Sequence, residues 1–126
     1  MRGLLHRIAS ENPSQRARLV ESVLANLQAI LNTERGGGPC TPGLGLDLQR
    51  LLMRWPASRH ETLLEIERLI RQFEPRLQIV NVSLMEHENP NRITVLIEAE
   101  FEDGAFCAKT ELTSLGGVTV RPSEVG

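Results

Sequence analysis

The sequence has few aromatic residues and almost no net charge. Its 126 residues include one tryptophan, three phenylalanines and no tyrosine. Proteins that hold single-stranded nucleic acid usually stack the bases on aromatic side chains, so the composition argues against that role. With 14 Lys and Arg residues against 16 Asp and Glu, the net charge is −2, which creates no long-range field for nucleic acid or an anionic membrane. We therefore expect neither as a partner.

Long apolar runs are also missing. The sequence has no run of eighteen or more apolar residues, and the apolar stretch near its start is too short for a signal peptide. We therefore expect a cytoplasmic protein with no membrane insertion. The two cysteines, Cys40 and Cys107, lie far apart and form no CxxC motif, which predicts free thiols.

Motifs for chemistry are equally scarce. The histidines fall in three separate segments, at His6, His60 and His87. None has the spacing to a cysteine or carboxylate that a metal site needs. The run Gly36–Gly38 lacks the GxxxxGK[ST] pattern of a phosphate-binding loop. The sequence therefore predicts no metal, no cofactor, no small-molecule substrate and no catalytic residue.

The first part of the chain has helical periodicity, and the length of 126 residues indicates one domain over 1–126. We expect a short helix and loop over 1–13, then a long helix from Ser14 to about Leu31 with one apolar stripe. Asn26 and Gln28 are assigned to the opposite, polar face. Residues 32–46 are rich in Gly and Pro and predict a loop.

Two further helices are expected between residues 47 and 75. Asp47 has the position of a helix cap, and that helix should end before Pro56. Ser58 and Glu61 have the spacing of a capping box for the next helix, which should run until Pro75.

The pattern changes to alternation beyond Leu77, which predicts a three-stranded antiparallel β-meander over 77–113. A tight turn at Asp103-Gly104 predicts three cross-strand pairs: Phe101 with Phe106, Ala99 with Ala108, and Glu98 with Lys109. The tail, 114–126, either adds a short edge strand at Val118–Val120 or trails. Helices followed by a meander make the fold class α+β, with the helices packed on the sheet.

The segment Glu74-Pro75-Arg76 lies where a helix must stop and a strand begin. One interpretation is that Pro75 only ends the helix while Glu74 and Arg76 are solvated. Another is that the carboxylate and the guanidinium pair with each other across the proline and organise the junction, or present a planar fork to a partner.

Three segments in order carry a family resemblance: ESVLANLQAILNTERGG, PGLGLDL and FEPRLQIVNVSL. The chain resembles the TssE family of type VI secretion baseplates, which is similar to the wedge protein and sheath initiator of contractile phage tails. In that family an arginine usually follows Asn-Thr directly, whereas here Glu34 stands between Thr33 and Arg35. The loop of the family usually carries an aromatic residue and a second proline, where this chain has Leu44 and runs from Leu46 straight into Asp47. The Glu74-Pro75-Arg76 match is intact.

The resemblance implies a cytoplasmic structural protein of the baseplate. It would bind the wedge subunits TssF and TssG through Glu74, Pro75 and Arg76, and offer a sheet edge from which the contractile sheath of TssB and TssC starts to assemble. Two rival functions remain. A lysozyme-like hydrolase would need two carboxylates roughly 5 to 9.5 Å apart in a cleft. The sequence offers only the strand residues Glu98, Glu100 and Glu102 and the helix-end residue Glu74. A soluble regulatory adaptor would need one protein partner and no sheath.

Overall fold

The computed structural model describes residues 13–32, 46–85, 92–102, 104–113 and 117–123. The described elements, in chain order, are helices α2 (Pro13–Asn32), α3 (Leu48–Met53) and α4 (Arg59–Phe73), followed by strands β1 (Gln78–Leu84), β2 (Arg92–Phe101), β3 (Gly104–Thr113) and β4 (Gly117–Pro122). The α+β prediction is confirmed. The helix expected within residues 1–13, most of the Gly/Pro-rich loop, His6, His87 and Cys40 lie outside the described residues.

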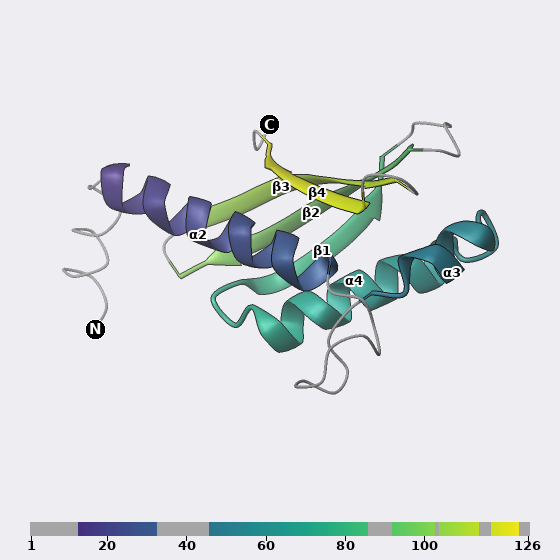
Figure 1. Cartoon of the computed structure of the whole chain (residues 1–126). Helices are drawn as coiled ribbons and strands as arrows, with labels where there is room; N and C mark the ends of the chain where they lie inside the picture. Colours follow the sequence, from purple (N-terminus) through teal and green to yellow (C-terminus); the bar gives the residue numbers. More distant parts are fainter. Residues whose placement is uncertain (1–12, 33–45, 86–91, 103, 114–116, 124–126) are drawn as a thin grey trace.

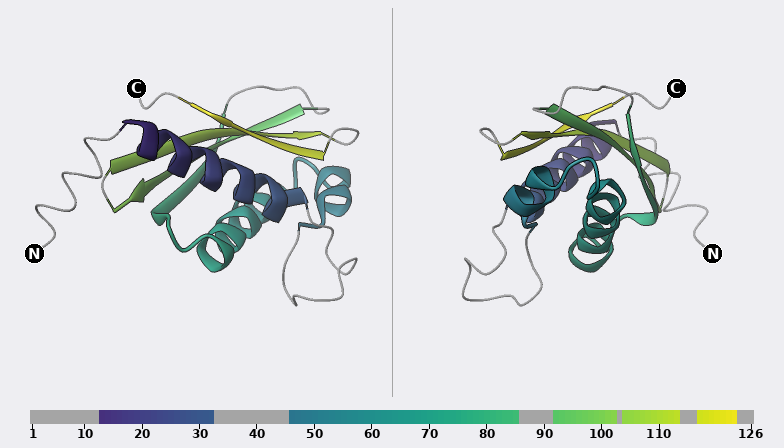
Figure 2. Two further views of the ribbon diagram at one scale, coloured as in Figure 1. Left: turned by 60° about the vertical axis from the view of Figure 1, so that its left-hand side comes forward. Right: turned by 90° about the vertical axis from the view of Figure 1, so that its right-hand side faces the viewer.

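The strands form one antiparallel sheet in the order β1-β2-β3-β4, which is the expected meander extended by an edge strand. Helices α2, α3 and α4 all lie on the same side of this sheet (Figures 1 and 2). Helix α2 packs against β4, whereas α4 packs against β1. Each long helix therefore packs on the face of the sheet near one of its two edge strands.

The core lies between the helices and the inward face of the sheet. Most of the strand residues expected on one face are buried: Val80, Ile93, Val95, Ile97, Ala99 and Phe101. Val82 and Leu84, expected on the same face, are half-buried. They meet an apolar stripe from the helices, formed by Val23, Leu27, Ile30, Leu31, Ile66, Leu69 and Ile70. The period-two pattern of the strands and the period-3.6 pattern of the helices therefore identify the residues on the two faces that form this core.

The predicted register of the β2–β3 hairpin is wrong. Phe101 pairs with Gly104, Ala99 with Phe106 and Glu98 with Cys107. A shift of two residues leaves every side chain on its expected face, so the apolar pattern could not detect it. A Cβ on residue 104 would lie 2.8 Å from Nη2 of Arg16. The guanidinium of Arg16 lies over this turn and donates from Nη2 to the carbonyl of Ala105 at 3.1 Å, which joins α2 to the start of β3.

Helix caps were predicted with mixed success. Asp47 accepts a hydrogen bond from the backbone N–H of Arg50 and caps α3, as expected. The prediction of a capping box at the start of α4 is wrong, because the Ser58 side chain makes no capping hydrogen bond. Ser58 Oγ instead donates to the carbonyl of Leu51, and Glu61 pairs with Arg50. The backbone of Ser58 is near helical, with φ −83° and ψ 6°, so the preceding turn already leads into the helix.

Candidate functional site

The segment Glu74-Pro75-Arg76 forms a tight turn between α4 and β1. The backbone N–H of Glu74 donates to the carbonyl of Ile70 at 2.9 Å and closes the helix. Glu74 then leaves helical geometry, with φ −133° and ψ 77°, because the ring of Pro75 crowds the residue before it. The N–H of Leu77 returns to the carbonyl of Glu74 at 3.2 Å. The chain direction therefore reverses at this junction, and α4 ends before Pro75 as predicted.

The side chain of Glu74 is buried and fully hydrogen-bonded. It is 1% exposed, so the interpretation of Glu74 as solvated is wrong. Its Oε1 accepts from Asn26 Nδ2 at 3.0 Å and from Arg76 Nη2 at 2.7 Å. Its Oε2 accepts from Arg76 Nε at 2.8 Å and from the Arg76 backbone N–H at 3.2 Å. Four donors match the acceptor capacity of a carboxylate, so Glu74 has no capacity for a partner chain.

Arg76 donates two parallel hydrogen bonds to the carboxylate of Glu74 and a third to a side chain of α2. Its Nη1 donates to Ser22 Oγ at 3.0 Å, while Asn26 Nδ2 also donates to the carbonyl of Phe73 at 3.2 Å. Polar side chains of α2 are thereby joined to the end of α4. Asn26, assigned to the polar face, is instead half-buried against this junction.

The surface that the junction offers to another molecule consists of Pro75 and one side of Arg76. Pro75 is exposed and the Arg76 side chain is 40% exposed. Within the described part of the chain, Nε, Nη1 and Nη2 of Arg76 each donate to a partner. A guanidinium has five N–H groups, so one hydrogen on each Nη is left for an acceptor elsewhere.

Two opposing effects, burial and hydrogen bonding, determine the pKa of Glu74. Burial acts to raise the pKa of the carboxyl, but hydrogen bonds from the Arg76 side chain, from Asn26 and from the Arg76 backbone outweigh it and hold the pKa below its ordinary value. The hydrogen bond with Glu74 raises the pKa of Arg76. Both groups are therefore charged at neutral pH.

This lowered pKa predicts a pH dependence of stability. A carboxyl whose pKa is lower in the folded state contributes stability that is fully present above its unfolded pKa of about 4.3 and is lost as the pH falls through the folded value. The excess stability of wild type over Glu74→Gln should therefore shrink below about pH 4.3. Urea midpoints of both proteins from neutral to acidic pH test this, and a difference that stays constant would contradict it.

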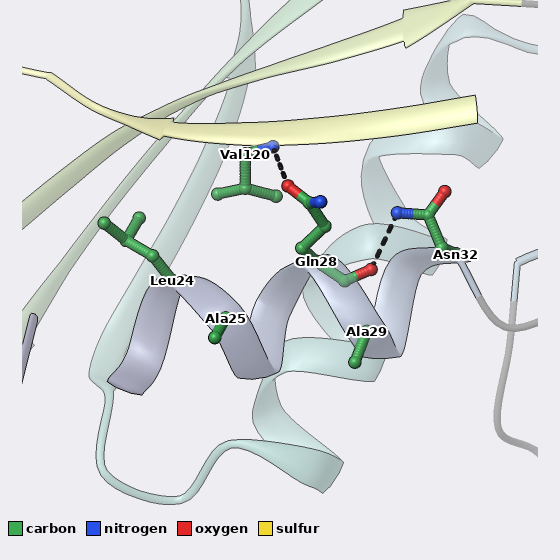
Figure 3. Close-up of a pocket in the computed structure, with 6 residues that line it drawn as sticks. All are labelled: Leu24, Ala25, Gln28, Ala29, Asn32 and Val120. Atoms are coloured by element: carbon green, nitrogen blue, oxygen red, sulfur yellow. Dashed lines mark hydrogen bonds between the residues drawn. The ribbon is translucent and has the colours of Figure 1, made fainter. Parts of the chain in front are cut away.

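The edge of the sheet at β4 is closed by side chains of α2. Asn32 accepts from the backbone N–H of Val118 at 2.8 Å and donates to its carbonyl at 2.6 Å, as a neighbouring strand would. Gln28 accepts from the N–H of Val120 at 3.1 Å (Figure 3). Gly117 has φ 72°, and a Cβ there would lie 2.7 Å from Asn32 Oδ1, so glycine permits this approach.

A groove of about 540 Å³ lies beside this contact, between α2 and β4. Figure 3 shows its lining by Leu24, Ala25, Gln28, Ala29, Asn32 and Val120. The amides of Gln28 and Asn32 are already bonded to the backbone of β4 or α2. Beside the groove, these side-chain amides occupy backbone groups of β4 that a fifth strand would otherwise pair with.

Loss of the Asn32 amide should weaken the fold. Asn32→Ala removes two hydrogen bonds to Val118 and should cost about 1 to 2 kcal/mol, at about 1 kcal/mol for each bond. Gln28→Ala removes one bond to the same strand and should cost about half as much. Chemical denaturation of the two variants beside wild type measures this difference, and an unchanged Asn32→Ala protein would contradict the proposed edge closure.

The opposite edge, at β1, is partly open. The N–H of Met85 donates to the carbonyl of Thr94, so backbone groups of alternate residues, Val82 and Leu84, point away from β2. Arg71 Nη2 donates to the carbonyl of Val80 at 3.3 Å. Within the described part of the chain, nothing pairs with the outward groups of Val82 and Leu84, which leaves a short free ladder.

The remaining candidates do not gather into a site. Glu98 and Glu100 are exposed on the outer face of the sheet, and Glu102 is exposed beyond the end of β2. His60 is exposed on α4, and Cys107 is a buried free thiol. Among the described residues, no group of His, Cys, Asp and Glu could hold a metal ion. None of the described helices is long and apolar enough to cross a membrane.

Comparison with known proteins identifies a family and finds structural similarity to a solved complex. The model of the family described as baseplate wedge protein gp25 matches residues 17–104. A chain in the solved structure "The baseplate complex from the type VI secretion system" is 23% identical, with a TM-score of 0.69 over 79% of this chain and 97% of that chain. At this identity the likeness establishes a shared fold. No curated protein matches the chain closely.

Proposed function

Because the chain belongs to the baseplate wedge protein gp25 family, we propose that it is a structural, non-enzymatic component of a type VI secretion baseplate, working in the cytoplasm. The observation that supports this most strongly is the intact turn of Glu74, Pro75 and Arg76. Its buried carboxylate holds a guanidinium in a fixed, half-exposed position at the surface. Similarity to a chain of a solved type VI baseplate complex favours the same assignment.

The three residues of the turn have different roles in the proposed binding: two contact the partner and one orients them. Pro75 and the outward N–H groups of Arg76 contact the wedge subunits TssF and TssG. Glu74 faces inward and fixes the plane of the guanidinium, which reduces the ordering cost of binding. A planar guanidinium can donate two parallel hydrogen bonds to a carboxylate or to backbone carbonyls.

The link to the sheath uses the open edge at β1. An extended segment of a sheath subunit, TssB or TssC, can add to Val82 and Leu84 by main-chain hydrogen bonds. The closed β4 edge cannot accept a strand in this way, because Asn32 and Gln28 already occupy the N–H groups of Val118 and Val120. Sheath assembly would therefore start on the side of the sheet covered by α4.

Affinity purification from cells that carry the secretion genes tests the proposed function. The tagged chain should co-purify with TssF and TssG, and cells that lack the chain should assemble few fluorescent sheaths. A chain that recovers neither wedge subunit, in cells whose sheath number does not depend on it, would exclude the baseplate role. Recovery of one other protein, with normal sheaths, would favour the regulatory adaptor.

A further inference from the structure

Ile79, at the start of β1, carries two unfavourable features at once. Its φ is 52°, the single positive value among the described residues other than glycine. A β-branched side chain is a genuine outlier in this region, because its Cβ crowds the backbone. The residue is also 69% exposed. Glycine or asparagine would fit this backbone better, and a polar residue would suit the solvent, so neither folding nor solubility explains the isoleucine.

A β-bulge produces this arrangement. Gln78 pairs with Glu100 and Asn81 with Glu98, so Ile79 and Val80 together stand opposite Ala99. The extra residue turns Val80 into the core and leaves Ile79 outside. Bulges often re-aim one side chain next to a functional site. Here the side chain that is re-aimed into solvent is large and apolar.

Ile79 follows the candidate site by three residues along the chain. Pro75, Arg76, Gln78 and Ile79 are all exposed, whereas Leu77 and Val80 are buried. The exposed group combines an apolar ring, a guanidinium with unused donors and a branched apolar side chain. Interfaces of this composition bind through a few anchors that fill pockets on the partner.

We propose that Ile79 is the apolar anchor of the partner contact, entering a pocket on the wedge protein beside the acceptors that receive Arg76. This inference rests on the proposed baseplate function and adds a residue and a chemistry to it. The partner surface should be apolar where Ile79 enters, with carbonyl or carboxylate oxygens at its margin. The strained backbone persists because it holds the side chain outward, where binding removes it from water.

The substitution Ile79→Gly tests the anchor, because its effects on folding and on binding are expected to have opposite signs. Glycine adopts positive φ without crowding, so the urea midpoint should be unchanged or higher. Binding to purified TssF–TssG complex should weaken about tenfold or more, as for loss of an interface anchor. Ile79→Asn also tolerates this backbone and should behave alike.

Two matched variants control the test. Ile79→Val keeps the branching and most of the apolar surface, and should bind within about fourfold of wild type, since one buried methylene contributes about 0.8 kcal/mol. Leu64→Ala removes an apolar side chain that is 52% exposed on α4 and should leave binding unchanged.

Three results would overturn the anchor. Wild-type binding by Ile79→Gly would show that the side chain is not used, and a clear loss of stability would show that it serves the fold. If Leu64→Ala weakened binding to TssF–TssG as much as Ile79→Gly, the binding would depend on exposed apolar surface in general and not on Ile79. If wild type itself fails to bind TssF–TssG, the proposed function falls and the anchor with it, a result distinct from the other three.

Discussion

Arg76→Ala is expected to lower the free energy of unfolding by about 3 to 5 kcal/mol, a large part of the stability of a small domain. The reason is the carboxylate left behind. Glu74 is 1% exposed, and without Arg76 its charge keeps the single amide bond from Asn26 and one backbone N–H. Chemical denaturation followed by circular dichroism measures the effect.

Removing the other partner should cost less. In Glu74→Ala the guanidinium that remains is 40% exposed and can be hydrated, so we expect a loss of about 1 to 3 kcal/mol. Arg54→Ala is a suitable control, because Arg54 is 53% exposed in its ion pair with Glu61 and such pairs contribute less than about 1 kcal/mol. An Arg76→Ala protein as stable as Arg54→Ala would show that the junction does not depend on this pair.

Much of the fold could be predicted because one-dimensional patterns determine it. The alternation from Ile93 to Phe101 places its buried residues correctly. In the predicted helix stripe, Val23, Leu27, Ile30 and Leu31 are buried, while Val20 and Leu24 are partly buried against the core. The hairpin register could not be predicted in this way. A shift of two residues preserves the pattern, so the alternation does not distinguish the predicted register from the observed one.

The sequence singles out Glu74, Pro75 and Arg76 as candidates, and their paired geometry was only one of several alternatives. The turn follows from Pro75 alone. The burial of Glu74 depends on Asn26, 48 residues away, and the orientation of Arg76 on Ser22, 54 residues away. An available signal was the position of Asn26, which lies three residues after Val23 and so near the apolar stripe. Ile79 was missed because no sequence pattern indicates a bulge between two adjacent apolar residues.

Arg76→Lys should separate the partner contact from the fold. Lysine keeps a positive charge beside Glu74, so most of the stability should remain. It lacks the planar fork and cannot hold both carboxylate oxygens while presenting fixed donors outward. Binding to TssF–TssG should weaken by about 2 to 5 kcal/mol, which is roughly 30-fold to several thousand-fold in Kd. Calorimetry with the purified wedge complex measures this, with Arg54→Lys as the control.

The most direct measurement of the baseplate role combines this variant with sheath counts in living cells. Cells whose own copy is replaced by Arg76→Lys should contain the folded protein at normal abundance, yet recover little TssF and TssG with it and assemble few sheaths. Arg54→Lys cells should match wild type in both respects. Arg76→Lys cells with normal wedge recovery and normal sheath numbers would contradict the assignment of this turn as the site that joins the protein to the baseplate.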